Sequence, residues 1–457
     1  MRILNRSMSS TTSGQANYQN NYKLWDQLDL SVAVHETYKG LPVEALFSMA
    51  IRVNKKRQFL FVSKLIAKHL AVNPALALGT GTLLASLLME KSGIAPPPQV
   101  DALAQMVGSG AADAGLMKSA LEYRAGLPEK TLFIGMAETA TGLGHSVFQH
   151  FTDSFYIHTT REEIAGLTPS FVFEEEHSHA TSHRVYAPEG MLEDAEAIVL
   201  IDDEISTGNT LVNLIQALDD QFPGKSYTSL SILDWRSPAQ QQNVAKLGAD
   251  RGISISVLSL ASGQFELHHG SSPDEAGPGN LRGQSSAEPV EADHAGELPH
   301  VSKTGQRYMP LTGRFGLSSA QQLGIDGWAR QTAKTLQSAE GEKPLVIGIG
   351  ENMYLPLRLA FELSGEALVQ TTTRSPIFAA DAEGYPIKGK AGFDLPDAEG
   401  IQQFIYNLEF LDITKIYLVA ESVVDVSAWQ PFLAYLEGIA PVEWVSLTAA
   451  KRREPVR

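Results

Sequence analysis

The chain has 457 residues, of which 43% are hydrophobic, with no cysteine and a formal net charge of −16. This length accommodates two or more domains, each with its own core. The lack of cysteine excludes disulfides, thiolate metal sites and cysteine nucleophiles. The acidic surplus argues against nucleic acid as a partner.

The N-terminal stretch is polar and lacks the apolar core of a signal peptide, so we expect a disordered tail over residues 1–20. No apolar run reaches the length needed to span a membrane. These features predict a soluble, cytoplasmic protein with no membrane partner. Because its net charge would repel an anionic ligand, any phosphate site needs local bases or Mg²⁺.

The first ordered stretch gives mixed signals. A helix is expected over Val43–Val53. The basic run Asn54–Arg57, with Lys64 and Lys68 spaced along the next expected helix, is either a solvated helix start or a phosphate-facing patch. Gly79–Thr82 indicates a helix entry rather than a nucleotide loop, because no strong strand precedes it.

Two strands with polar ends follow. Thr131–Ile134 is apolar and leads into the small-residue loop Gly135–Gly144, which precedes a helix. Ser154–Ile157 is a shorter strand that ends in His158-Thr159-Thr160-Arg161. Arg161 suits a pyrophosphate group, because its planar guanidinium can pair with two oxygens at once. A surface salt bridge to a neighbouring glutamate is the alternative.

The stretch Phe173–Arg184 is rich in acids and histidines. The spacing of His177, His179 and His183 is compatible with a metal site. The stretch is also polar and has no well-formed scaffold, which favours a mobile segment instead.

The most informative stretch is Ile198–Thr210. Its apolar start predicts a strand buried on both faces, which ends in Asp202 and Asp203. A small polar loop and a helix follow, and the loop comprises Ser206, Thr207, Gly208, Asn209 and Thr210. Such a loop can turn backbone N–H groups toward a phosphate at the helix terminus. A ribose 5-phosphate fits both parts, because its hydroxyls can donate to the carboxylates. In the alternative, the acids only cap the next helix.

The rest of the chain contains two more strands and a linker. Tyr227–Leu233 is a strand followed by Asp234, Trp235 and Arg236, and Ile253–Leu260 is another strand. The polar stretch Gly270–Thr304 reads as a disordered linker. The expected division is a tail (1–20), a first domain (21–268), a linker (269–305) and a second domain (306–457).

Two motifs carry a family resemblance. Ile198–Thr210 resembles the signature of the type I phosphoribosyltransferases, which is an apolar strand, two acids, two further residues and S/T-T-G-x-T; Glu204 departs from the usual apolar or small residue. Thr373-Arg374-Ser375-Pro376 spells the motif that names the TRSP domain, and Gly313–Gly316 and Gly384–Pro386 also agree with that domain. The chain is therefore similar to the transferases with a C-terminal TRSP domain in the tellurite-resistance and stress operons.

The resemblance implies an α/β fold, with a parallel sheet flanked by helices and a second, smaller α/β domain. It implies Mg²⁺-dependent transfer of ribose 5-phosphate from phosphoribosyl pyrophosphate (PRPP) to an unidentified nitrogen base, in the synthesis of a nucleoside-like compound. A mobile loop that closes over PRPP would cover residues 174–184. A homodimer and complexes with other stress-operon proteins are further expectations.

The resemblance also assigns roles to individual residues. Asp202 and Asp203 would be catalytic and would contact Mg²⁺ indirectly through PRPP, and the loop Ser206–Thr210 would bind the 5-phosphate. Asp234, Trp235 and Arg236 would line the base pocket, although a tryptophan that closes the core is the alternative. The residues expected to bind pyrophosphate are Ala137, Glu138, Thr139, Ala140, Arg161 and Arg184.

Other functions are compatible with the same sequence. A regulator that binds PRPP without turnover would keep the fold, because fold alone does not decide function. A scaffold for stress-operon proteins rests on the acidic linker alone. The presence of both acids and of a lid-like stretch favours the enzyme.

The two halves share a sequence pattern. Leu132–Glu138 is echoed by Leu345–Glu351, and each is followed at the same distance by Thr-Thr-Arg, which ends in Arg161 and Arg374. We therefore predict that the second domain is a degenerate transferase-like unit. In it, Glu351, Arg374 and Ser375 would line a pocket for a phosphorylated or anionic ligand. Alternatively, Arg374 pairs with Glu351 to brace a loop.

Overall fold

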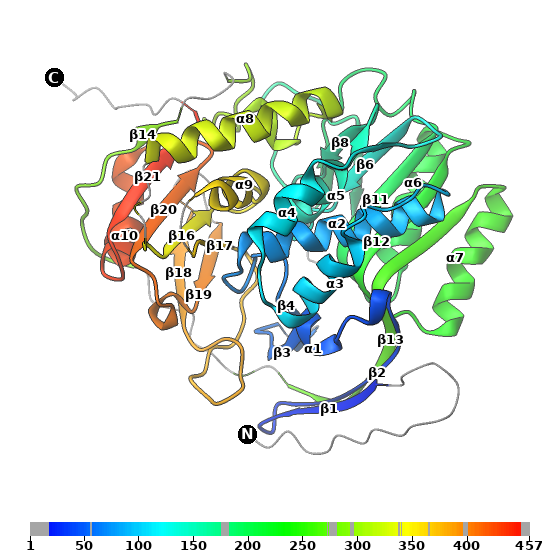
Figure 1. Ribbon diagram of the computed structural model, residues 1–457, viewed down its shortest axis with the longest axis horizontal. Helices are drawn as coiled ribbons and strands as arrows, with labels where there is room; N and C mark the ends of the chain where they lie inside the picture. The colour runs from blue at the N-terminus through cyan, green and yellow to red at the C-terminus, as the bar shows by residue number, and fades with distance from the viewer. Residues whose placement is uncertain are drawn as a thin grey trace.

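The structure, a computed structural model, describes residues 18–54, 57–174, 182–271, 273, 281–292, 297–336, 339, 341–363, 366–395 and 401–448. It confirms the predicted mixed α/β class. A larger and a smaller sheet lie on either side of a layer of helices that contains α2 (Pro74–Lys91), α5 (Thr141–Phe148) and α9 (Tyr354–Glu362) (Figure 1).

The larger sheet has a parallel centre and antiparallel edges. Its order is β1 (Tyr18–Leu24), β2 (Leu28–Thr37), β13 (Ile255–Gly270), β12 (Ser226–Asp234), β11 (Ala197–Ile205), β6 (Thr131–Gly135), β8 (Phe155–His158) and β15 (Leu317–Ser318). Strands β13 to β8 run parallel, whereas β1, β2 and β15 are antiparallel to their neighbours. β1 begins at Tyr18, so the end of the predicted tail belongs to the sheet.

The chain order in this sheet creates a switch point. From β6 the chain moves outward to β8, then returns to β11 on the other side and continues to β12 and β13. Open α/β sheets bind ligands outside the carboxyl ends of their strands at such a reversal. The crevice between the ends of β6 and β11 is therefore the expected ligand site.

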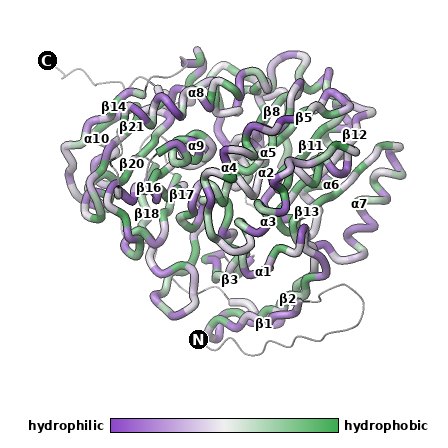
Figure 2. Tube along the Cα trace, in the orientation of Figure 1, coloured by the Kyte–Doolittle hydropathy of each residue, from purple (hydrophilic) through white to green (hydrophobic). Residues whose placement is uncertain are grey.

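Burial explains why the central strands form. Every residue of β6 is buried, as are Ile198–Ile201 in β11, so both strands are covered on both faces (Figure 2). Helix α6 (Asn209–Gln221) buries Leu211, Leu214 and Ile215 at the predicted helical spacing. β11 is longer than the predicted strand, because it continues through the acids to Ile205.

The smaller sheet repeats this chain order. It consists of β14 (Val290–Glu291), β21 (Val442–Ser446), β20 (Lys415–Ala420), β16 (Pro344–Gly348) and β17 (Leu368–Thr371), all parallel. β17, β16, β20 and β21 are arranged in the same chain order as β8, β6, β11 and β12. The second half of the chain also contains the helices α8 (Ser319–Leu336) and α10 (Val426–Glu437).

Small elements complete the described chain. They are α1 (Val43–Leu46), β3 (Phe47–Ile51), β4 (Phe59–Ser63), α3 (Val100–Ser109), α4 (Ala114–Leu121), β5 (Ala125–Gly126), β7 (Phe151–Thr152), α7 (Pro238–Arg251), the hairpins β9 (Phe171–Glu174) with β10 (Ser182–Val185) and β18 (Lys390–Asp394) with β19 (Gln402–Tyr406), and short 3₁₀ turns at Tyr38–Gly40, Pro310–Thr312 and Leu408–Phe410. The predicted helix over Val43–Val53 is wrong, because α1 gives way to β3, which pairs with β4. Gly79–Thr82 lies within α2 rather than at its start.

The two halves interlock. β15 belongs to the second half of the chain but pairs with β8 of the larger sheet. Val72 forms a bridge to Val369 at the edge of the smaller sheet, and α2 packs on both α5 and α9. Part of the predicted disordered linker is ordered, since β14 joins the smaller sheet and Ser285 Oγ donates to Glu437 at 2.9 Å.

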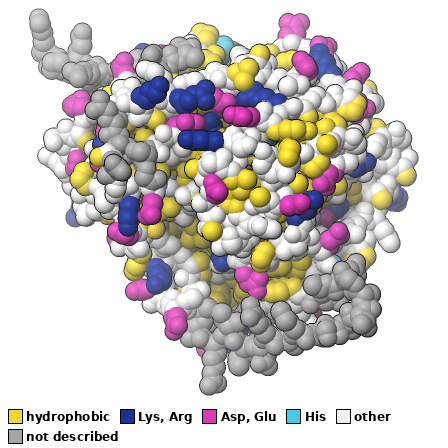
Figure 3. Space-filling model, in the orientation of Figure 1, with side chains coloured by type: hydrophobic (Ala, Val, Ile, Leu, Met, Phe, Trp, Pro, Cys, Tyr) yellow, Lys and Arg dark blue, Asp and Glu magenta, His cyan; other side chains and the backbone are white. Residues whose placement is uncertain are grey.

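The surface carries mixed charge. Basic and acidic side chains are interspersed on the face shown in Figure 3, with hydrophobic atoms scattered among them. Within the described chain, no helix is long and apolar enough to cross a lipid bilayer.

Candidate functional site

The acidic end of β11 forms one wall of the switch-point crevice. Asp202 and Asp203 are both partly buried there, and the Asp203 N–H donates to Asp202 Oδ1 at 2.9 Å. Burial raises the pKa of Asp203, while the bond with Asp202 and the positive charges of Arg57 and Lys68 oppose that shift. The two carboxylates therefore form a compact acidic edge with bases nearby.

Arg57 explains the unusual third acid in this strand. The Glu204 side chain is only 9% exposed, and its Oε1 lies 2.7 Å from Arg57 Nη2. Burial raises the pKa of Glu204, and the Arg57 charge opposes the shift. Arg57 thus neutralises Glu204 and leaves Asp202 and Asp203 as the acids of the crevice.

The loop Ser206–Thr210 turns from β11 into α6. Gly208 caps the helix with a φ of +81°, and the Asn209 N–H donates to Thr207 Oγ1 at 3.3 Å. A Cβ at Gly208 would lie 2.8 Å from Arg236 Cδ, so a glycine is needed for both the turn and the close approach. The loop presents the N-terminal end of α6, which favours an anion.

Asp234 and Arg236 brace this loop. Arg236 donates from Nε and Nη2 to the two carboxylate oxygens of Asp234, at 2.9 and 2.7 Å. Trp235 is 3% exposed and stacks on Phe61 with ring centroids 4.9 Å apart. Trp235 is thus a core residue, which agrees with the alternative considered for it and not with a place in a base pocket.

The loop after β6 forms the opposite wall of the crevice. The Met136 N–H donates to the Ile201 carbonyl at 2.9 Å, which ties this loop to β11. The Ala137 N–H donates to Thr159 Oγ1 at 2.8 Å, and Ala137–Glu138 is a cis peptide. The segment Ala137–Ala140 thus lies beside the acidic edge.

Glu138 is neutralised by a lysine that the motif did not indicate. Glu138 is 6% exposed and lies 2.9 Å from the ammonium group of Lys68, which is 1% exposed. Burial lowers the pKa of Lys68, whereas the Glu138 charge raises it. In the sequence, the only features that pointed to Lys68 were its place in the predicted basic patch and its position among apolar residues after β4.

Arg161 and Arg184 are brought together by a backbone bridge. Thr160 and Arg184 form an isolated antiparallel bridge, and Arg184 Nη1 donates to the Arg161 carbonyl at 3.2 Å. Arg184 Nη2 donates to Glu163 at 2.7 Å, and Glu163 also pairs with Lys303. Both arginines therefore lie at the β8 side of the crevice.

An acid from the second half anchors the same segment. Glu351 Oε2 accepts from Thr160 Oγ1 at 2.6 Å, and Glu351 Oε1 accepts from the Arg161 N–H at 2.9 Å. Glu351 also pairs with Arg314 at 3.4 Å. Burial alone would raise the pKa of Glu351, but Arg314, His158 and these hydrogen bonds hold it at about 2. No bond joins Arg374 to Glu351 in the described part of the chain, so the structure does not support the alternative in which this pair braces a loop.

The contact is reciprocal. Arg374 donates its backbone N–H to Glu138 Oε2 at 3.5 Å, as Arg161 does to Glu351. The Gly350 N–H donates to Thr372 Oγ1 at 3.0 Å, as Ala137 does to Thr159. Each half therefore inserts its glutamate into the Thr-Thr-Arg segment of the other.

Part of the predicted lid lies outside the described residues. His177 and His179 fall within 175–181, which the structure does not describe. His183 is buried, with Nδ1 3.0 Å from Thr159 Oγ1. Within the described ranges, no three histidines, aspartates or glutamates are grouped in a way that could hold a metal. Asp202 and Asp203 nevertheless offer hard oxygen donors that fit a Mg²⁺ ion held mainly by a ligand's own oxygens.

Two family models match the chain. Residues 46–264 match the model described as a phosphoribosyl transferase. Residues 311–436 match the model of the TRSP domain, which is found C-terminal to that transferase. The two matches together cover about three quarters of the chain, and no curated protein matches it.

Several solved structures are similar to parts of the chain. Adenine phosphoribosyltransferase from Trypanosoma brucei, in complex with AMP, pyrophosphate and ribose-5-phosphate, is 19% identical over 28% of this chain and 56% of its own length, with a TM-score of 0.22. The Leishmania donovani adenine enzyme is 18% identical over 33% and 69%, with a TM-score of 0.21. A hypoxanthine phosphoribosyltransferase from Staphylococcus aureus is 9% identical over 43% and 79%, with a TM-score of 0.20.

Proposed function

Because the chain belongs to the phosphoribosyltransferases that are followed by a TRSP domain, we propose that it transfers ribose 5-phosphate from PRPP to a nitrogen base and releases pyrophosphate. One observation carries the proposal. The acidic end of β11, the loop Ser206–Thr210 and the loop Ala137–Ala140 meet at the switch point of the larger sheet.

The acids act on the sugar. Asp202 and Asp203 accept hydrogen bonds from the ribose hydroxyls and stabilise the positive charge that develops at the anomeric carbon. Glu204 takes no part, because Arg57 neutralises it at 2.7 Å. The partial burial of both aspartates strengthens their field at the reacting carbon.

The loops hold the two phosphate groups. The N–H groups and hydroxyls of Ser206–Thr210 bind the 5-phosphate at the N-terminus of α6 and keep the sugar in register. The leaving pyrophosphate lies against Ala137–Ala140 and Arg161, whose guanidinium pairs with two oxygens. Asp202 and Asp203 would hold a Mg²⁺ ion indirectly through PRPP, and the ion would supply positive charge to the leaving group.

We also propose that the reaction belongs to the synthesis of a nucleoside-like compound in a stress response, which the TRSP resemblance supports. Because Trp235 is held in the core by Phe61, a base would have to be recognised by groups other than its indole ring.

A direct assay tests the proposal. The full chain is incubated with PRPP, Mg²⁺ and a panel of purine, pyrimidine and pyridine bases, and mass spectrometry follows pyrophosphate and new nucleotides. We expect stoichiometric release of both products with at least one base. Tight PRPP binding without turnover on any base would contradict the enzyme and indicate a regulator instead.

A further inference from the structure

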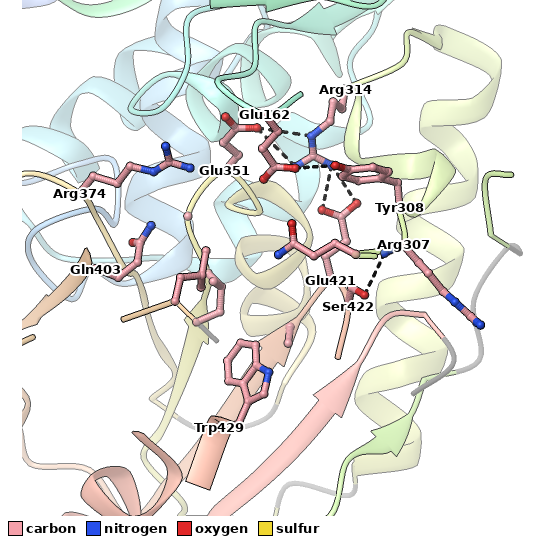
Figure 4. A pocket seen from close by; sticks show the side chains of 15 residues that line it. Glu162, Arg307, Tyr308, Arg314, Glu351, Arg374, Gln403, Glu421, Ser422 and Trp429 are labelled. Atoms are coloured by element: carbon pink, nitrogen blue, oxygen red, sulfur yellow. Dashed lines mark hydrogen bonds and ion pairs between the residues drawn. The ribbon is translucent and has the colours of Figure 1, made fainter. Parts of the chain in front are cut away.

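The second half contains a pocket at its own switch point. The pocket lies at the carboxyl ends of β16, β17 and β20 and is bounded by Gln403 of β19 and Trp429 of α10 (Figure 4). The chain order reverses between β16 and β20, as it does between β6 and β11 in the larger sheet. Ligands bind at such positions in open α/β sheets.

The strand register shows which transferase features this pocket lacks. Gly348 faces Val419, as Gly135 faces Ile201, so Ala420 and Glu421 take the places of Asp202 and Asp203. Glu421 accepts two bonds from Arg314, at 3.0 and 2.9 Å. Because no Thr-Gly-x-Thr follows β20, this pocket has no loop for a 5-phosphate. Its ligand is therefore not PRPP bound as in the first half.

Two polar side chains in the pocket have no partner among the described residues. Gln403 is fully buried, yet neither its Oε1 nor its Nε2 forms a hydrogen bond to the part of the chain that the structure describes. Leaving both atoms of a buried amide unpaired is costly, so it calls for a ligand. The guanidinium of Arg374 forms no ion pair or hydrogen bond within the described residues. Arg374 and Gln403 lie together on one side of the pocket, and Ser375 is not among its lining residues (Figure 4).

The other charged groups around the pocket have ion-pair or hydrogen-bond partners. Arg314 pairs with both Glu351 and Glu421. Burial raises the pKa of Glu162, whose carboxyl group accepts a hydrogen bond from the Tyr308 hydroxyl at 2.7 Å. These groups cluster on the side opposite Arg374 (Figure 4). Among the described residues that line the pocket, Arg374 is therefore the cation whose guanidinium has no partner.

We propose that this pocket binds a compact oxyanion of the phosphate type. The Arg374 guanidinium would pair with two of its oxygens, and Gln403 Nε2 would donate to a third. Gln403 Oε1 would accept from a P–OH group, which hydrogen phosphate, hydrogen pyrophosphate and a singly protonated monoester all carry. A carboxylate at neutral pH lacks that donor, so the paired donor and acceptor favour phosphate.

The position of the site suggests its purpose. The backbone N–H of Arg374 donates to Glu138, which belongs to the predicted pyrophosphate loop of the first half. An anion bound to the Arg374 side chain would therefore be held by a residue whose backbone contacts that loop. Anion binding at this pocket does not depend on the proposed transferase activity. The calorimetry below tests the binding, and the assay with PRPP and bases tests the activity.

Calorimetry on the full chain tests the site. Titration with pyrophosphate should reveal two sites in the wild type, because the first half offers its own loop. We expect Arg374→Ala to weaken one of them at least ten-fold and Arg161→Ala to weaken the other. Arg374→Lys should give an intermediate loss, and Gln403→Leu should weaken the same site as Arg374→Ala.

Arg307→Ala is the matched control, since Arg307 also lines the pocket but is paired with Glu297. It should leave both sites unchanged. Parallel titrations with inorganic phosphate and AMP distinguish a free anion from a phosphate monoester as the occupant. A single pyrophosphate site that is lost in Arg161→Ala and unchanged in Arg374→Ala would overturn the proposal, as would no binding at all.

Discussion

Glu351 Oε1 accepts a hydrogen bond from the backbone N–H of Arg161 at 2.9 Å, across the boundary between the two halves of the chain. The second half thereby holds the segment that carries the predicted pyrophosphate-binding arginine. Glu138 makes the converse contact to the backbone of Arg374. The exchange resembles an interface between two copies related by a two-fold axis, although one chain supplies both sides.

Replacing Glu351 with glutamine should impair PRPP binding. An amide keeps a single acceptor oxygen, so either Thr160 Oγ1 or the Arg161 N–H loses its partner. We expect KM for PRPP to rise by about ten-fold, with a loss of about 3 kcal/mol in the free energy of unfolding because Arg314 loses one carboxylate. Steady-state kinetics and urea unfolding measure the two effects.

Glu421→Gln provides the control for this variant. Glu421 also pairs with Arg314, at 2.9 Å, but Thr160 and Arg161 donate their hydrogen bonds to Glu351 and not to Glu421. Glu421→Gln should lower the free energy of unfolding by a similar amount and leave KM for PRPP unchanged. Equal KM values for the two variants would show that Glu351 has only a structural role.

Asp202→Asn and Asp203→Asn should each abolish transfer while the fold remains intact. The loss of a charge at the reacting sugar removes transition-state stabilisation, and removing one group that stabilises transition-state charge costs about 10²–10³-fold in kcat. Initial rates of pyrophosphate release give the effect, and circular dichroism reports the fold. Glu204→Gln changes the adjacent acid, which Arg57 neutralises, and should retain most of the activity. Near wild-type turnover of either asparagine variant argues against these acids as the catalytic pair.

Gly208→Ala should distort the 5-phosphate loop. The residue has a φ of +81°, and its new Cβ would lie 2.8 Å from Arg236 Cδ. We expect a rise of at least about ten-fold in KM for PRPP, because a displaced loop loses ground-state contacts. Gly224→Ala is matched to it, since Gly224 has a φ of +82° and nothing within 4 Å. That control should lose about 1 kcal/mol of stability and no affinity. Identical KM values for the two would contradict the role of the loop.

Thr210→Ala should weaken PRPP binding more than turnover. A hydroxyl that contacts the 5-phosphate does so in both the ground state and the transition state, so its loss raises KM and leaves kcat nearly unchanged. A fall in kcat at unchanged KM would place Thr210 with the reacting groups instead.

Acid should destabilise the fold before the carboxylates titrate. Burial lowers the pKa values of His69 and His145 to about 3 and those of His150 and His158 to about 4. These side chains are neutral when folded and take up protons on unfolding, with an ordinary pKa of about 6.5. Their contribution is fully present above about pH 6.5 and is lost as the pH falls toward 4, by up to about 1.4 kcal/mol per pH unit for each histidine.

Urea unfolding at intervals from pH 7.5 to 5 measures this slope. His150→Gln should reduce the slope of the free energy of unfolding against pH by up to about 1.4 kcal/mol per pH unit, since glutamine cannot titrate. A free energy of unfolding that stays constant between pH 6.5 and 5 would mean that these histidines are protonated in the folded chain.

The sequence was informative where a site is local. The loop Ser206–Thr210 follows its strand directly, and its residue types alone predict a phosphate site without reference to the rest of the fold. The sequence does not predict the ion pairs of Lys68 and Arg314, because their partners Glu138 and Glu351 lie far along the chain. The local pattern of Val43–Val53 predicts a helix, but the pairing of β3 with β4 is a tertiary contact that overrides local propensity.

The same limit applies to Trp235. Its position after a strand end is compatible with a base pocket, and only packing against Phe61 reveals a core residue. The strand order of the smaller sheet follows the repeat expected from Leu132–Glu138 and Leu345–Glu351, and its β16 and β17 are parallel neighbours. We continue to propose that the second domain is a degenerate transferase-like unit.

The pairing of β15 with β8 has a consequence for the order of events during synthesis. The edge of the larger sheet remains open until Leu317 and Ser318 have left the ribosome. The bridge partner of Val72 is Val369, which emerges later still. The first half therefore cannot reach its final contacts as an independently emerging unit. Ribosome-bound chains that end before residue 317 should be protease-sensitive at β8, and they should need a chaperone to protect that exposed edge.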